Sequence, residues 1–144
     1  MEKAVVLLSG GLDSATALYF AKHKGLECFC LIFNYGQRHR KEILSAKAIA
    51  KRANCKWQVV KIDLPWKGSS LLDKKLKIPE PKNPRTQEPL NSRTQELKNS
   101  IPLTYVPARN IIFLSFALSY AEAIGARSIF IGANAIDYSG YPDC

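Results

Sequence analysis

Residues 4–14 read Ala4-Val5-Val6-Leu7-Leu8-Ser9-Gly10-Gly11-Leu12-Asp13-Ser14, an apolar run followed by a turn with two glycines. The apolar run has the length and composition of a strand that is buried on both faces. From Ser14 the apolar residues recur at helical spacing, and this pattern ends near Lys24-Gly25. A buried strand that passes through a glycine turn into a helix predicts the first unit of an α/β fold.

The alternation of strand and helix patterns continues along the chain. The sequence predicts further strands at 28–33, 57–62 and 128–131, and helices at 40–54 and 110–124. Parallel strands need crossover connections of this kind. We therefore expect a three-layer α/β fold with a doubly wound, Rossmann-like parallel sheet, in a single domain over residues 1–144.

One segment breaks this regularity. Residues 64–104 hold six of the eight prolines, together with many Lys, Asn, Ser and Gln residues. So long a loop within a compact domain is uncommon, and we interpret it as a Pro/Lys-rich insertion that is either flexible or a lid over a site.

Composition limits the class of protein. With 144 residues, 47% hydrophobic and 23% charged, the chain can bury a core and does not have the composition of a disordered protein. It has no apolar run near the roughly 20 residues that cross a bilayer, and no signal-peptide pattern. We expect a soluble, cytoplasmic protein without a membrane partner.

The net charge of +9 favours an anionic partner such as a nucleotide. The excess does not extend to residues 105–144, which carry two basic and three acidic side chains. We interpret Lys47, Lys51 and Arg52 as the solvated face of a helix, so nucleic acid is not the favoured partner.

The cysteines are too few for a disulfide framework. Cys28 and Cys30 stand two apart in a predicted strand and would share one face, which favours buried core thiols over metal ligands.

The turn between the first strand and the first helix is the leading candidate for chemistry. Backbone N–H groups and the positive end of a helix favour a bound phosphate, and Gly10 and Gly11 allow its close approach. Ser9 and Ser14 add hydroxyl groups, and Asp13 could hold Mg²⁺ or cap the helix. The alternative is an ordinary turn with a Ser or Asp N-cap. A G-x-x-x-x-G-K-[ST] motif is absent.

The pattern Ser-Gly-Gly-x-Asp-Ser resembles the PP-loop of the N-type ATP pyrophosphatases. Within that group, three further segments resemble signatures of the 7-cyano-7-deazaguanine synthase family: 34–39, 105–110 and 132–144. The resemblance implies a fold of the adenine nucleotide alpha hydrolase type. It also implies an ATP-dependent ligase that converts 7-carboxy-7-deazaguanine and ammonia to 7-cyano-7-deazaguanine, a queuosine precursor, through an adenylated intermediate.

The resemblance also implies roles for individual residues. The nucleotide-binding residues would be Ser9, Gly10, Gly11, Leu12, Asp13 and Ser14. The catalytic residues would be Asp13, Arg38, His39 and Arg109. The substrate-binding residues would be Tyr35, Gln37, Arg109, Asn110, Asn134, Asp137 and Tyr138. Arg109 opens an otherwise apolar helix in which Glu122 is the one acidic residue. A core-facing Arg109 would therefore lack a partner nearby in sequence, and an anionic ligand could supply one.

Two features depart from the family pattern. Asn34 stands where many members have Asp, which removes a charge but keeps a polar group. The family continues beyond the segment that residues 132–144 resemble to a cluster of zinc-binding cysteines, which this sequence does not contain, so either the chain is a fragment or the zinc region has been lost. Cys28, Cys30 and Cys55 do not stand at matching positions. We therefore assign no zinc ligand and expect no stoichiometric zinc, although the family implies Zn²⁺ besides ATP and Mg²⁺.

The resemblance further suggests a homodimer. Two other functions remain open from the sequence: another PP-loop adenylating enzyme, such as a tRNA-thiolation enzyme, and a nucleotide-binding module without catalysis. Enzymes of the first kind generally use cysteines near the site, which the predicted burial of Cys28 and Cys30 does not favour.

Overall fold

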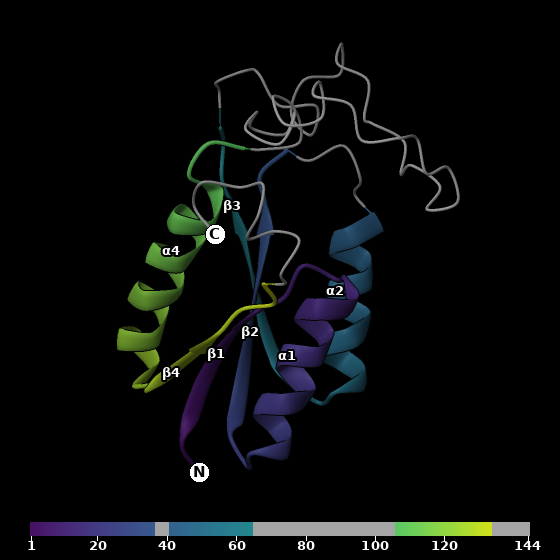
Figure 1. The fold of residues 1–144 in the computed structure, drawn as a ribbon, viewed down its shortest axis with the longest axis vertical. Coiled ribbons are helices and arrows are strands. Elements are labelled where there is room, and N and C mark those ends of the chain that lie inside the picture. The colour runs from purple at the N-terminus through teal and green to yellow at the C-terminus, as the bar shows by residue number, and fades with distance from the viewer. Residues whose placement is uncertain (37–40, 65–105, 134–144) are drawn as a thin grey trace, which may run out of the picture.

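Four parallel strands form the sheet at the centre of the molecule. The computed structural model describes residues 1–36, 41–64 and 106–133 (Figure 1). The strands are listed in chain order: β1 (Lys3–Leu7), β2 (Glu27–Asn34), β3 (Lys56–Lys61) and β4 (Ser128–Phe130). Their order across the sheet is β3-β2-β1-β4, and each neighbouring pair is parallel.

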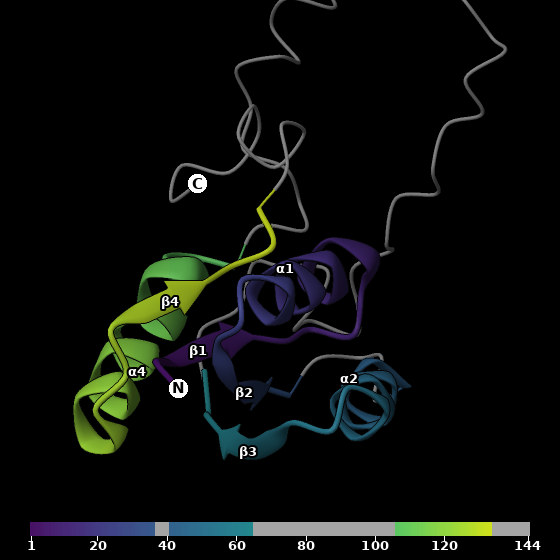
Figure 2. The ribbon, with the colours of Figure 1, turned by 90° about the horizontal axis from the view of Figure 1, so that it is seen from below.

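Helices cover both faces of this sheet. They are α1 (Leu12–His23), α2 (Lys41–Arg52) and α4 (Arg109–Ile124). Figure 2 shows α1 and α2 on one side of the strands and α4 on the other. The predicted three-layer, doubly wound α/β fold is thus confirmed, and each predicted element is present with its ends within two residues of the prediction.

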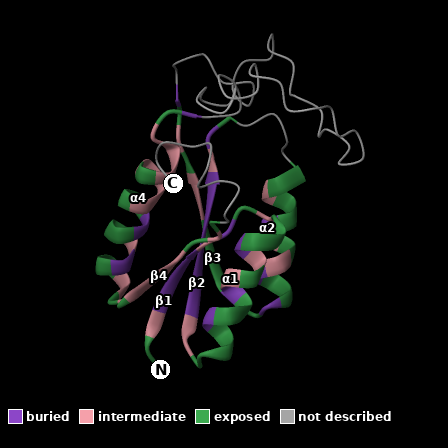
Figure 3. Ribbon diagram, in the orientation of Figure 1, coloured by how far each residue is buried: buried purple, intermediate pink, exposed green. Residues whose placement is uncertain are grey.

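The strands alternate between two hydrophobic cores, because successive side chains point to opposite faces. Val6, Cys30 and Ile32 pack with Leu18 of α1 and with α2, whereas Val5 and Leu31 pack with α4. Figure 3 shows β1 and β2 as mostly buried, and the helices as exposed on their outer sides. Small residues of α2 and α4 sit closest to the sheet: Ala46, Ala50, Ala117 and Ala121 are all buried.

Some apolar residues of the predicted helices lie on the outer side. Tyr19 and Phe20 of α1 are about half exposed, and Leu44 of α2 is 66% exposed. Their neighbours Leu18 and Ala46 fill the core instead, since each helix presents only one side to the sheet.

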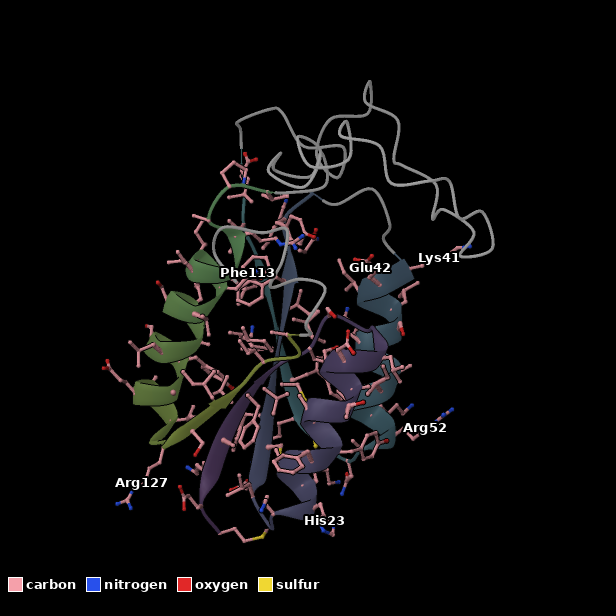
Figure 4. All side chains as sticks on the ribbon, viewed as in Figure 1. His23, Lys41, Glu42, Arg52, Phe113 and Arg127 are labelled. Carbon is pink, nitrogen blue, oxygen red and sulfur yellow. The ribbon has the colours of Figure 1, made fainter. Side chains whose placement is uncertain are left out.

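Because all four strands are parallel, their carboxyl ends meet at one edge of the sheet. Residues 8–11, 35–36 and 131–133 leave the strands at this edge. Figure 4 shows Lys41 and Glu42 at this end of the molecule, and His23, Arg52 and Arg127 at the opposite end. The predicted insertion at 64–104 lies outside the described residues, apart from the buried Leu64.

Within the described ranges, none of the helices is both long enough and apolar enough to cross a membrane.

Candidate functional site

The connection from β1 to α1 forms a tight loop at the carboxyl edge of the sheet. We call residues 9–14 the glycine loop. Gly11 is the N-cap of α1, has extended dihedral angles, and receives no side-chain capping bond. Neither a serine nor Asp13 therefore caps this helix, and Asp13 lies within its first turn. The helix thus begins with backbone N–H groups and the positive end of its dipole at the loop, an arrangement that favours anions.

Ser14 holds the glycine loop together from within. Its side chain is 4% exposed, and its hydroxyl donates to the Gly11 carbonyl oxygen at 3.0 Å. Because that bond uses the only hydroxyl proton of Ser14, Ser9 donates both its N–H, at 3.2 Å, and its hydroxyl, at 3.0 Å, to Ser14 Oγ. The Ser14 hydroxyl is therefore fully engaged within the loop.

Gly10 lies against α2 with no room for a side chain. Its φ of +90° is in the left-handed region that glycine tolerates best. A Cβ at this position would clash with the Glu42 carbonyl oxygen and lie 2.9 Å from the Ala46 nitrogen, both of which are backbone atoms. Figure 4 shows Glu42 at this end of α2. The Ser45 hydroxyl also donates to the Gly10 carbonyl oxygen at 3.0 Å.

Gly132 makes a similar close approach from the other side. It follows β4, and a Cβ there would lie 2.6 Å from the carbonyl carbon of Asp13 and 2.7 Å from Ser14 Cα. The segment that leaves β4 therefore touches the first turn of α1. Only glycine permits this contact, so the glycine loop is held between α2 and the segment after β4.

A second group of side chains lies at the same edge of the sheet, on the face covered by α4. We call Phe33, Tyr35, Arg109 and Phe113 the Tyr35 cluster. Arg109 Nη1 donates to the Tyr35 hydroxyl at 3.1 Å, and the guanidinium carbon lies 5.7 Å from the Tyr35 ring centroid. From the sequence, we expected an anionic ligand to be the partner of Arg109. In the structure, the Tyr35 hydroxyl is a partner of its guanidinium.

Aromatic packing fixes this arrangement. The rings of Phe33 and Phe113 stack with centroids 4.0 Å apart, and Phe113 lies 5.4 Å from the Tyr35 ring. Figure 4 shows Phe113 on the side of α4 that faces the strands. Tyr35 is 8% exposed and Arg109 is half-buried, so the guanidinium is held by a rigid ring system close to the surface.

The start of α4 has an unusual backbone. Ala108 is its N-cap in the left-handed region, at φ 52°, which costs an alanine about 1 kcal/mol. The Arg109 N–H then bonds to the Val106 carbonyl oxygen at 3.1 Å. Strain of this kind is common at functional sites, and here it directly precedes Arg109.

The structure brings some of the predicted site residues together. It places Ser9 to Ser14 in one loop, pairs Tyr35 with Arg109, and puts Asn110 beside Arg109 in the first turn of α4. The other predicted site residues lie outside the described residues: Gln37, Arg38, His39, Asn134, Asp137 and Tyr138. Ser45 and Phe113 have no role predicted from the sequence, because neither belongs to a recognisable motif.

The cysteines lie in the core, away from this edge. Cys28, Cys30 and Cys55 are buried together beneath α1 and α2. Burial raises the pKa of Cys28 to about 11 and that of Cys30 to about 12, and it also raises the pKa of Cys55. These thiols stay protonated near neutral pH. The part of the chain that the structure describes has no group of three or more His, Cys, Asp or Glu residues that could hold a metal ion.

Fold and site together define a class: an α/β protein with a glycine loop between its first strand and its first helix. NMN synthetase from Francisella tularensis has the same fold, with a TM-score of 0.59 and 19% identity, over 95% of this chain and 48% of that chain. This likeness concerns the fold alone.

The sequence comparison is more specific. The chain belongs to the family described as "Queuosine biosynthesis protein QueC", which it matches over residues 3–144. It is 54% identical to a 7-cyano-7-deazaguanine synthase of Nostoc punctiforme, with 99% of this chain and 60% of the relative covered. It is 50% identical to one of Thermoplasma volcanium, with 99% and 55% covered. The chain thus spans 55–60% of the length of these two relatives.

Proposed function

We propose that this chain carries the ATP-binding part of a 7-cyano-7-deazaguanine synthase. The observation that carries the proposal is the glycine loop, which joins β1 to an uncapped α1 and has Asp13 in the first helical turn. Relatives with that name match almost all of this chain at 50–54% identity. These relatives do not favour a tRNA-thiolation enzyme, and the buried, protonated cysteines also weigh against thiolate chemistry.

The chemistry fits the site. A carboxylate is a poor electrophile, so an oxygen of 7-carboxy-7-deazaguanine attacks the α-phosphorus of ATP, and the bond to pyrophosphate breaks. The departing pyrophosphate is an anion, and the start of α1 favours negative charge there. Ammonia then displaces AMP to form an amide. A second ATP then adenylates the amide oxygen with release of pyrophosphate, this oxygen leaves with AMP, and loss of the two N–H protons gives the nitrile.

Individual side chains take separate parts in this proposal. Asp13 would hold Mg²⁺, because carboxylate oxygens are ligands that this ion prefers. Its place in the first turn of α1 puts the carboxylate at the end of the glycine loop where ATP would bind. Arg109 would bind the substrate carboxylate, since a guanidinium suits planar anions and Tyr35 holds it in place. By resemblance, Arg38 and His39 would act as catalytic groups. Gln37, Asn110, Asn134, Asp137 and Tyr138 would bind substrate.

Other family properties belong to the proposal as well. We propose that the protein is a homodimer and is located in the cytoplasm. Its nitrogen donor would be ammonia, and it would act without a nucleic-acid partner. We assign no zinc to Cys28, Cys30 or Cys55, because all three thiols pack in the hydrophobic core beneath α1 and α2. Zinc analysis of the purified protein tests this assignment directly.

Product analysis tests the central reaction. The protein is incubated with ATP, Mg²⁺ and ammonia, with and without 7-carboxy-7-deazaguanine, and the nucleotides are separated by chromatography. We expect AMP and pyrophosphate only when the carboxylate compound is present. ADP and inorganic phosphate as primary products would contradict the proposal.

A further inference from the structure

One hydrogen bond ties the glycine loop to a helix that is distant in sequence. Ser45 of α2 donates its hydroxyl to the Gly10 carbonyl oxygen at 3.0 Å, across 35 residues. Two other helical hydroxyls behave differently: Thr16 and Ser115 each bond at 2.9 Å to the carbonyl oxygen four residues earlier in their own helix. That local bond is the usual choice for a hydroxyl within a helix. Ser45 instead contacts the candidate site.

This bond acts on the peptide that is easiest to rotate in the loop. The Gly10–Gly11 peptide has a glycine on each side, so its dihedral angles permit a flip of the peptide plane that a Cβ on either side would resist. In a trans peptide the C=O and the following N–H point in opposite directions, and none of the described peptides is cis. A bond that fixes the Gly10 carbonyl toward α2 therefore fixes the Gly11 N–H away from α2.

Helix α2 is a firm support for such a bond. Its residues Ala46 and Ala50 are fully buried against the sheet, and its backbone lies directly against Gly10. Ser45 itself is exposed, so its hydroxyl adds little to the core. The geometry thus separates the two roles: alanines anchor α2, and the Ser45 hydroxyl orients the loop.

The Gly11 N–H makes one long and exposed bond, of 3.4 Å, to Ser9 Oγ, which a phosphate oxygen could replace. We propose that Ser45 is a positioning residue, which holds the Gly10–Gly11 peptide so that the Gly11 N–H can turn from Ser9 Oγ to the phosphates of ATP. This inference rests on the proposed function, because it requires that the glycine loop binds ATP. Ser45 does not touch the ligand. It acts through the Gly10 carbonyl by removing the flipped conformation of the loop before ATP arrives.

ATP affinity of the full chain tests the inference, measured by isothermal titration calorimetry with thermal unfolding on the same samples. We expect Ser45→Ala to weaken ATP binding roughly fivefold, the effect of losing one ordinary hydrogen bond, with little change in Tm. Ser45→Thr keeps the hydroxyl and should retain most of the affinity. Ser115→Ala removes another exposed helical hydroxyl, from α4, and is the matched control, for which we expect no change.

The outcomes separate this inference from the proposed function. If the wild-type chain fails to bind ATP, the proposed function fails and the role of Ser45 fails with it. If the wild type binds ATP and Ser45→Ala binds equally well, only the role of Ser45 is overturned. Equal losses in Ser45→Ala and Ser45→Thr, or in Ser45→Ala and Ser115→Ala, would also overturn it, since the effect would not depend on this hydroxyl bond.

Discussion

The glycine loop and the Tyr35 cluster lie at the same edge of the sheet but are built from different parts of their residues. In the loop, backbone atoms and two hydroxyls make the structure, and glycines allow α2 and the segment after β4 to approach. The Tyr35 cluster is instead built from side chains, namely one guanidinium and three aromatic rings. Added atoms should therefore damage the loop, whereas removed atoms should damage the cluster. In the proposed function, the loop binds phosphate and the cluster binds a planar carboxylate.

Asp13 is the one acidic side chain within the glycine loop, so its removal should have the largest effect. Asp13→Ala should abolish turnover, because a proposed ligand of Mg²⁺ is lost. Its favourable contact with the helix dipole is worth only about 0.3–1 kcal/mol, so the fold should remain. Turnover and circular dichroism are measured together, with Asp63→Ala as an exposed control. A folded and fully active Asp13→Ala variant would show that the carboxylate has no part in the reaction.

Gly10→Ala tests whether the loop depends on close backbone contact. The new Cβ would meet backbone atoms of α2, and such overpacking costs about 1–3 kcal/mol. We expect ATP affinity to fall by about tenfold or more. Gly25→Ala is the matched control, because Gly25 also has a positive φ, of +77°, but has nothing within 4 Å of a new Cβ. It should lower stability by about 1 kcal/mol and leave ATP binding unchanged. Equal ATP affinities in the two variants would contradict the close-contact account.

Tyr35→Phe tests the other region by removing a single oxygen. The ring keeps its packing on Phe113, but Arg109 loses the acceptor at 3.1 Å. A hydrogen bond to a charged group is worth about 1.5–3 kcal/mol, and we expect the KM for the carboxylate substrate to rise roughly tenfold. Tyr120→Phe removes a phenol hydroxyl from the same hydrophobic core and is the control. An unchanged KM in Tyr35→Phe would mean that the pair does not serve substrate binding.

The smallest effect concerns the core thiols, which lie outside both regions. The pKa of Cys30 is raised from 9.0 in the unfolded chain to about 12 in the folded protein. Above pH 9 the unfolded chain loses this proton while the folded protein keeps it, so stability is complete below pH 9 and falls as the pH rises toward 12. Cys30→Ala should reduce this fall, as measured by urea unfolding at pH 8 and pH 10. An identical loss of stability in the variant would contradict the buried-thiol account.

The separation in sequence between contacting residues decides what could be predicted. The fold was predictable because β1, β2 and the helices are local patterns, and parallel strands with crossovers leave few alternatives. The glycine loop was predictable because Ser9 to Ser14 are contiguous. The contact of Tyr35 with Arg109 spans 74 residues, and that of Ser45 with Gly10 spans 35. Such contacts depend on how helices pack, which no local pattern records.

Ser14 illustrates the same limit within a motif. From the sequence, the Ser14 hydroxyl is among the groups that could bind a phosphate. In the structure Ser14 is buried, and its hydroxyl makes three hydrogen bonds that stabilise the loop. The motif identified the residue, whereas only the three-dimensional arrangement shows where its single proton goes. The proposed contact of Ser14 with phosphate remains a prediction.

Separate binding measurements for the two substrates test the central claim most directly. ATP and 7-carboxy-7-deazaguanine are each titrated calorimetrically into the wild type, Gly10→Ala and Tyr35→Phe. We predict that Gly10→Ala loses affinity for ATP and keeps it for the carboxylate compound, and that Tyr35→Phe does the reverse. Loss of ATP affinity in Tyr35→Phe, with Gly10→Ala unchanged, would contradict the assignment of phosphate to the loop and carboxylate to the cluster.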